Sequence, residues 1–127
     1  MGRYYYGDIE GKFMFAVQPS DAGERFGAYE VPIEPEYLDY KVERNSYDDI
    51  CNELESIEDS GAVKRVKHMW SELEKEGQMG YNQDDMKRFK VSDNDMSEYA
   101  DWIMGKQMKD YFDENPDAKW LNFNAEL

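Results

Sequence analysis

The sequence predicts an α+β domain in which an N-terminal antiparallel sheet packs against helices from the rest of the chain. Aromatic and β-branched residues alternate with turn residues over positions 1–45, whereas apolar residues recur at three- and four-residue spacing over 46–127. The length of 127 residues also suits one domain. We therefore expect a single domain, 1–127, with a β-rich first part and a helical second part.

A β-hairpin over residues 3–18 is expected to begin the sheet, because two apolar runs flank a segment rich in Gly and Asp. A four-residue loop over residues 8–11, with Gly11 taking a positive φ, would place Tyr6 opposite Phe13, with Tyr5 and Met14 on the opposite face. Both faces would then be largely apolar. We expect both to be covered, either by the protein's own helices and loops or by a partner chain or second copy.

Two further strands are predicted near 28–33 and 37–44, which gives an antiparallel meander. Residues 37–44 alternate apolar and polar side chains, as a half-buried strand does. Pro32 confines the preceding strand to an edge or ends it, because proline cannot donate a ladder hydrogen bond. Capping residues within 19–27 predict a short helical turn between the hairpin and these strands.

Three main helices are predicted at about 47–58, 62–76 and 96–113, because apolar residues line one side of each. A shorter helix is expected after Asn82, which can cap it. The tail, residues 118–123, contains bulky apolar side chains that need burial. We expect it to return to the sheet as a C-terminal edge strand.

Acidity is the strongest feature of the composition. The chain has 29 acidic and 15 basic side chains, a formal net charge of −14, and its helical part, 46–127, carries −10 of that charge. Such a surface repels phosphates, which argues against direct nucleic acid binding and against anionic membranes. It suits a basic protein partner, although acidity can also serve solubility alone.

No catalytic, cofactor or metal motif is present. The chain has one histidine and one cysteine, and it lacks a nucleophile elbow and a phosphate-binding glycine loop. A calcium loop starting at Asp113 fails, because Ala118 and Asn124 replace the required Gly and Glu. We expect neither an enzyme nor a cofactor. The lone cysteine, together with the lack of a signal-peptide or membrane-spanning pattern, predicts a cytoplasmic protein, in host cytoplasm if it is viral.

A basic island at residues 64–68 stands out within this acidic chain, and glutamates follow it in the same helix. This charge order opposes the helix dipole. The island could contact an anionic group or an acidic partner surface, or it could pair with carboxylates of the same chain. The candidate binding residues are two hairpin side chains, the island, and carboxylates of the helices: Tyr5, Met14, Lys64, Arg65, Lys67, His68, Glu72, Glu74, Glu76, Asp110, Asp113 and Glu114.

These features favour a small acidic protein-binding module. In its sharpest form it is an inhibitor or nucleic-acid mimic, of phage or viral type, whose carboxylates occupy a basic surface on a target. One alternative is a binder of an anionic, ring-bearing small molecule such as a nucleotide, with a homo-oligomer expected if the pocket lies between chains. The other is a structural or regulatory subunit of a complex. Phosphate mimicry should weaken steeply with ionic strength, whereas hydrophobic docking should not.

Overall fold

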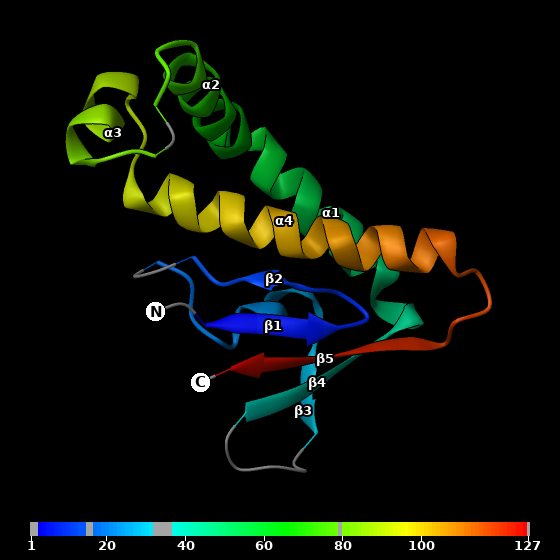
Figure 1. Ribbon diagram of the computed structural model, residues 1–127. Helices are drawn as coiled ribbons and strands as arrows, with labels where there is room; N and C mark the ends of the chain where they lie inside the picture. The colour runs from blue at the N-terminus through cyan, green and yellow to red at the C-terminus, as the bar shows by residue number, and fades with distance from the viewer. Residues whose placement is uncertain (1–2, 15–16, 32–36, 79, 127) are drawn as a thin grey trace.

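The computed structural model describes residues 3–14, 17–31, 37–78 and 80–126, and it confirms the α+β fold (Figure 1). Within these residues the sheet has five antiparallel strands: β1 (Tyr4–Gly7), β2 (Gly11–Lys12), β3 (Tyr29–Val31), β4 (Tyr37–Glu43) and β5 (Trp120–Glu126). The helices are α1 (Tyr47–Asp59), α2 (Ala62–Lys75), α3 (Gln83–Phe89) and α4 (Asp93–Glu114), with short 3-10 helices η1 (Ala22–Phe26) and η2 (Arg44–Ser46).

The strand order is β2-β1-β5-β4-β3, so the C-terminal strand is central in the sheet. A strand at the C-terminus was expected, but at an edge. It pairs with β1 through Tyr5 and Ala125, and with β4 through Tyr40 and Phe123. The N-terminal hairpin and the β3–β4 pair are therefore joined by β5, and they do not form one continuous meander.

The predicted register of the first hairpin is wrong. Tyr5 lies opposite Gly11, and the rings of Tyr5 and Phe13 pack on the inner face with centroids 5.0 Å apart. Tyr6 is exposed instead. The cause is Gly7, which adopts a φ of 140° and is the last residue of β1. Only glycine fits at this position, because a Cβ there would lie 2.7 Å from the carbonyl oxygen of Asn122 on β5.

The helices follow their predicted ranges closely. Helix α4 begins three residues before the expected start, because the Ser92 side chain accepts a hydrogen bond from the backbone N–H of Asp95 and Asp95 accepts one in return. Asn82 and Asp85 form the same reciprocal cap on α3. No helix in the described part of the chain is both long and apolar enough to cross a membrane.

Helix α4 contributes side chains to two hydrophobic cores. Its C-terminal part, including Met108 and Phe112, packs with α1 against the inner face of the sheet. Its N-terminal part, including Met96, packs against Met69 of α2 and Met86 of α3. This arrangement places α2 and α3 at one end of α4, beyond the sheet.

The outer face of the sheet has no covering element among the described residues. Four large side chains on it are 42–47% exposed, namely Tyr4, Tyr6, Tyr29 and Trp120. The protein's own helices therefore supply the expected cover on the inner face only.

We predict that Gly105→Ala destabilises the protein, although alanine is the better helix former. A Cβ at Gly105 would lie 2.5 Å from a ring carbon of Phe26 and 2.9 Å from a methyl of Leu54, both buried. We expect the free energy of unfolding to fall by about 1–3 kcal/mol in urea titrations.

Adding Phe26→Leu to Gly105→Ala should recover part of this loss, because the smaller side chain leaves space for the methyl group. A gain in stability on Gly105→Ala alone would show that α4 and η1 do not approach as closely as described.

Candidate functional site

Helix α1 carries six carboxylates and no lysine, arginine or histidine. Its buried stripe of Ile50, Leu54 and Ile57 fixes its rotation against the core. The carboxylates at five other positions therefore face solvent: Asp48, Asp49, Glu55, Glu58 and Asp59. Within the described residues, only the sixth, Glu53, forms an ion pair, with Arg25 at 2.8 Å.

The end of α4 adds Asp113, one of the predicted site residues, to this acidic region. Its carboxylate accepts hydrogen bonds from the hydroxyl of Tyr47 at 2.6 Å and from the ammonium of Lys109 at 2.8 Å. Lys109 and Tyr47 together hold the pKa of Asp113 below its usual range. Because Tyr47 is the first residue of α1, this contact connects the acidic ends of the two helices.

Asp110 and Glu114, also predicted, face the β1–β2 turn. They line a cleft of about 210 Å³ together with Asp8. The turn is fixed on α4 by a hydrogen bond from the Glu10 backbone N–H to the side-chain oxygen of Gln107, at 3.0 Å. The carboxylates therefore continue across α4 from α1 to the hairpin turn.

We call this set the acidic surface: Asp8, Glu10, Asp48, Asp49, Glu55, Glu58, Asp59, Asp110, Asp113 and Glu114. Two cations adjoin it, Lys106 and Lys109, which line a cavity of about 370 Å³ beside Cys51. Among the described residues, no group of three or more His, Cys, Asp or Glu side chains is placed to hold a metal ion. The chemistry available here is the binding of cationic groups.

Two members of the basic island on α2 have partners within the chain. Arg65 donates two hydrogen bonds to the carboxylate of Asp95, at 2.9 and 2.7 Å, and the ammonium of Lys67 lies 4.6 Å from the centre of the Trp102 ring. Arg65 lowers the pKa of Asp95. His68 packs edge-on against Phe89, and Lys64 is exposed.

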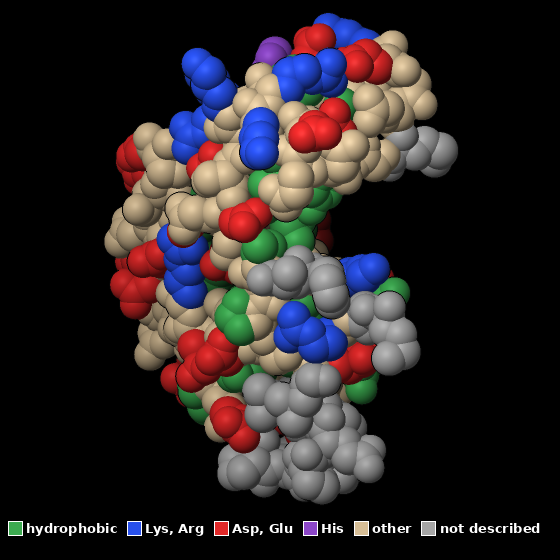
Figure 2. Space-filling model, turned by 90° about the vertical axis from the view of Figure 1, so that its left-hand side faces the viewer, with side chains coloured by type: hydrophobic (Ala, Val, Ile, Leu, Met, Phe, Trp, Pro, Cys, Tyr) green, Lys and Arg blue, Asp and Glu red, His purple; other side chains and the backbone are tan. Residues whose placement is uncertain are grey.

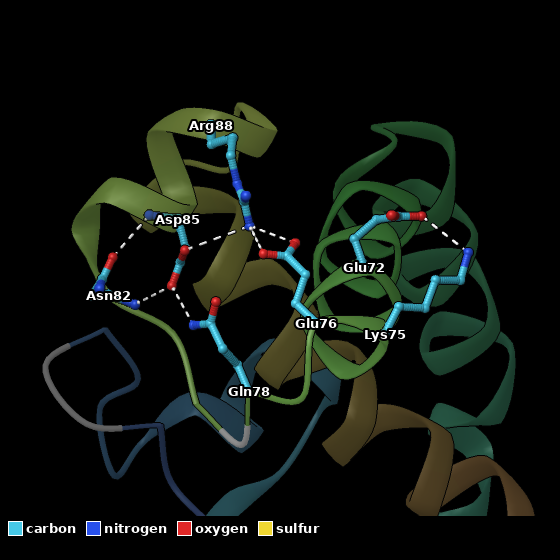
Figure 3. A network of polar contacts seen from close by, with 7 residues as sticks. All are labelled: Glu72, Lys75, Glu76, Gln78, Asn82, Asp85 and Arg88. Atoms are coloured by element: carbon cyan, nitrogen blue, oxygen red, sulfur yellow. Dashed lines mark hydrogen bonds and ion pairs between the residues drawn. The ribbon is translucent and has the colours of Figure 1, made fainter.

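Of the predicted glutamates at the end of α2, Glu76 belongs to a polar network with α3 (Figure 3). Arg88 of α3 donates to both carboxylate oxygens of Glu76, at 3.1 and 2.8 Å, and lies 3.8 Å from Asp85. Gln78 donates to Asp85 as well. Glu72 pairs with Lys75 on its own helix, whereas Glu74 is exposed. The network fixes α3 on α2, so its carboxylates have a structural role.

Tyr5 and Met14 lie on the wall of a groove between the hairpin and the α2–α3 loop. The groove has a volume of about 460 Å³, with Trp70 and Tyr81 on its other wall. Figure 2 shows a hollow between the part with α2 and α3 and the part with the sheet. Tyr5 itself is buried, its hydroxyl accepts a hydrogen bond from Gln107, and burial raises its pKa to about 12.

The predicted site residues thus fall in three places: the acidic surface, helix α2 with its α3 network, and the groove. The structure does not bring the basic island to the groove wall formed by Tyr5 and Met14. The α1 carboxylates were not singled out from the sequence. Counting charge helix by helix would have found them, since α1 has a charge of −6 in 13 residues.

Comparison with models of known protein families, with curated proteins and with solved structures finds no match.

Proposed function

We propose that this protein is a small protein-binding module that presents its acidic surface to a basic surface on a target protein. The observation that carries the proposal is helix α1, whose five exposed carboxylates form no ion pair within the described residues. A helix with this many unpaired carboxylates lowers the free energy of contact with a cationic surface.

The spacing of these carboxylates supports nucleic-acid mimicry in particular. At about 1.5 Å per residue, Asp48 and Asp59 lie about 16.5 Å apart along the helix, so the four intervals between its five exposed charges average about 4.1 Å. One strand of B-DNA carries a phosphate about every 3.4 Å along the axis. A target that binds a phosphate backbone would therefore meet a similar charge density on α1, and the module would act as a competitive inhibitor.

The alternative of a nucleotide-like small molecule has less support. To bind such an anionic molecule, the basic island would have to supply free cations beside an aromatic pocket. Arg65 is engaged with Asp95, and Lys67 lies over Trp102.

We predict that removing four of the exposed charges of α1 strongly weakens binding of the target. The variant Asp48→Asn, Asp49→Asn, Glu55→Gln, Glu58→Gln removes four charges from solvent-facing positions. Proteins would be captured from an extract of the source cells at low ionic strength and identified, and the affinity of the captured protein would then be measured against salt. We expect the captured protein to be a basic nucleic-acid-binding protein that duplex DNA releases from the module. Its affinity for the α1 variant should be about 100-fold lower than for the wild type, or lower still.

The matched control neutralises four exposed carboxylates elsewhere, by Glu30→Gln, Glu74→Gln, Asp84→Asn and Asp93→Asn. It has the same net charge as the α1 variant, and we expect it to bind nearly as well as the wild type. Equal loss in both variants would show a general charge effect. Binding that is unaffected by salt, by DNA and by the α1 variant would exclude phosphate mimicry.

A further inference from the structure

The outer face of the sheet places aromatic rings around a polar centre. Side chains on β5 alternate, so Leu121 and Phe123 point to the core while Trp120, Asn122 and Asn124 share the outer face. We call the following residues the outer aromatic face: Tyr4, Tyr6, Tyr29, Asp39, Lys41, Trp120, Asn122 and Asn124.

The pairing of the strands gives the layout of this face. Tyr6 of β1 pairs with Asn124, which pairs in turn with Asp39 of β4. Lys41 pairs with Asn122 on one side and with Tyr29 of β3 on the other. Amide, carboxylate and ammonium groups therefore occupy the middle of the face, with aromatic rings at its margins.

Two of the rings are held in place while remaining accessible. The ammonium of Lys41 lies 3.9 Å from the centre of the Trp120 ring, which is still 44% exposed. The hydroxyl of Tyr29 donates to the carboxylate of Glu43 at 3.3 Å, and its ring is 43% exposed. Rings that are fixed before a ligand arrives lose little conformational entropy on binding.

The centre of the face is hollowed and carries polar side chains among its apolar surface. A cavity of about 660 Å³ lies between Tyr29 and Trp120, within the usual range for ligand sites. In the described part of the chain, the side-chain amides of Asn122 and Asn124 make no hydrogen bond with protein groups. Each amide offers two donors and an acceptor. The charges within the cavity, Asp39 and Lys41, cancel.

We propose that the outer aromatic face binds a neutral oligosaccharide. The charge of the protein, −14, opposes a polyanion such as single-stranded nucleic acid, and the balanced charge of this face provides no cationic track for phosphates. A neutral ligand with hydroxyl groups and flat apolar ring faces matches the free amides and the exposed aromatic rings.

The size of the face also argues for a short ligand rather than a second copy of the chain. From β1 to β3 the four strands span about 14 Å, and from Asn124 to Trp120 the face is about 13 Å long. At 42–47% exposure its four rings present roughly 300–450 Å² of accessible surface, whereas a stable protein interface buries about 800 Å² on each partner. A few sugar units fill the smaller area.

The test is a glycan array of neutral and anionic oligosaccharides, followed by calorimetry with the best-bound soluble glycan. We expect a neutral glycan to bind the wild-type protein, and Trp120→Ala and Tyr6→Ala each to weaken it about tenfold or more. Tyr81→Ala removes a similarly exposed ring outside this face and should leave affinity unchanged. The α1 variant described above should bind the glycan normally, since α1 lies elsewhere.

Three results would overturn the proposal. These are no binding anywhere on the array, binding of anionic glycans or a single-stranded oligonucleotide only, and a dimer in sedimentation analysis that Trp120→Ala dissociates. Because both aromatic variants replace exposed side chains, far-UV circular dichroism should show that they remain folded. Beyond these three results, retained affinity in both variants would also overturn the proposal, because it would place the glycan elsewhere.

Discussion

Replacing Phe123 by alanine is expected to lower the free energy of unfolding by about 3–5 kcal/mol. Phe123 is 2% exposed, and its ring stacks on Tyr40 of β4 with centroids 5.3 Å apart and meets Tyr5 of β1 edge-on at 6.2 Å. Because β5 is the central strand, this one side chain joins the hairpin to the β3–β4 pair. Urea titration followed by circular dichroism would measure the loss.

Asn122→Ala is the matched control, since Asn122 precedes Phe123 on the same strand but points to the outer face. We expect its effect to stay within about 0.5 kcal/mol. If both substitutions destabilised the protein equally, the inner and outer faces of β5 would not differ as described.

Features set by local pattern could be predicted from the sequence. The helices and the C-terminal strand were found, because apolar periodicity and capping residues act over a few positions. The central place of β5 in the sheet could not be predicted, because it depends on pairing between Tyr5 and Ala125, which are 120 residues apart in the sequence. Nothing within residues 118–123 distinguishes a central strand from an edge strand.

The hairpin register failed for a related reason. The prediction gave the turn glycine's role to Gly11, whereas Gly7 has the positive φ. Glycine is needed at position 7 because Asn122 and Phe123 of β5 approach it closely, and this is a contact between the two ends of the chain. The shift exchanged Tyr5 and Tyr6 between the faces, which is why a residue expected to bind a ligand is buried in the core.

Prediction of the candidate site had a similar limit. Asp110, Asp113 and Glu114 were singled out from the sequence, and the structure places them on the acidic surface. The partners of the basic island, Asp95 and Trp102, lie on α4, so only the fold shows that Arg65 and Lys67 are engaged.

We expect Arg25→Met to lower the free energy of unfolding by about 3 kcal/mol. Arg25 of η1 forms ion pairs with Glu53 of α1 at 2.8 Å and, on α4, with Glu98 at 2.9 Å and Asp101 at 3.1 Å. The Asp101 side chain is only 12% exposed, so losing the guanidinium leaves a nearly buried carboxylate without a cation.

Lys75→Met provides the control, since Lys75 pairs with Glu72 at the surface, where the two side chains are 70% and 35% exposed. Its loss should cost at most about 1 kcal/mol. If the free energy of unfolding fell by a similar amount in both variants, the ion pairs of Arg25 with α1 and α4 would stabilise the protein no more than a surface ion pair does.

The pH dependence of the Arg25→Met effect separates charge from packing. Burial raises the pKa of Asp101 above its ordinary value of 3.8, and Arg25 and Gln18 oppose that rise. Without Arg25 the pKa rises further, so the folded variant binds a proton more readily than the unfolded chain, and lowering the pH favours its folding.

The stability difference between wild type and Arg25→Met should therefore be largest near pH 7 and should narrow as the pH falls toward 3.8. Urea titrations at several pH values would follow it. A difference that stays constant across this range would assign the role of Arg25 to the packing of its aliphatic stem, because that contribution does not titrate.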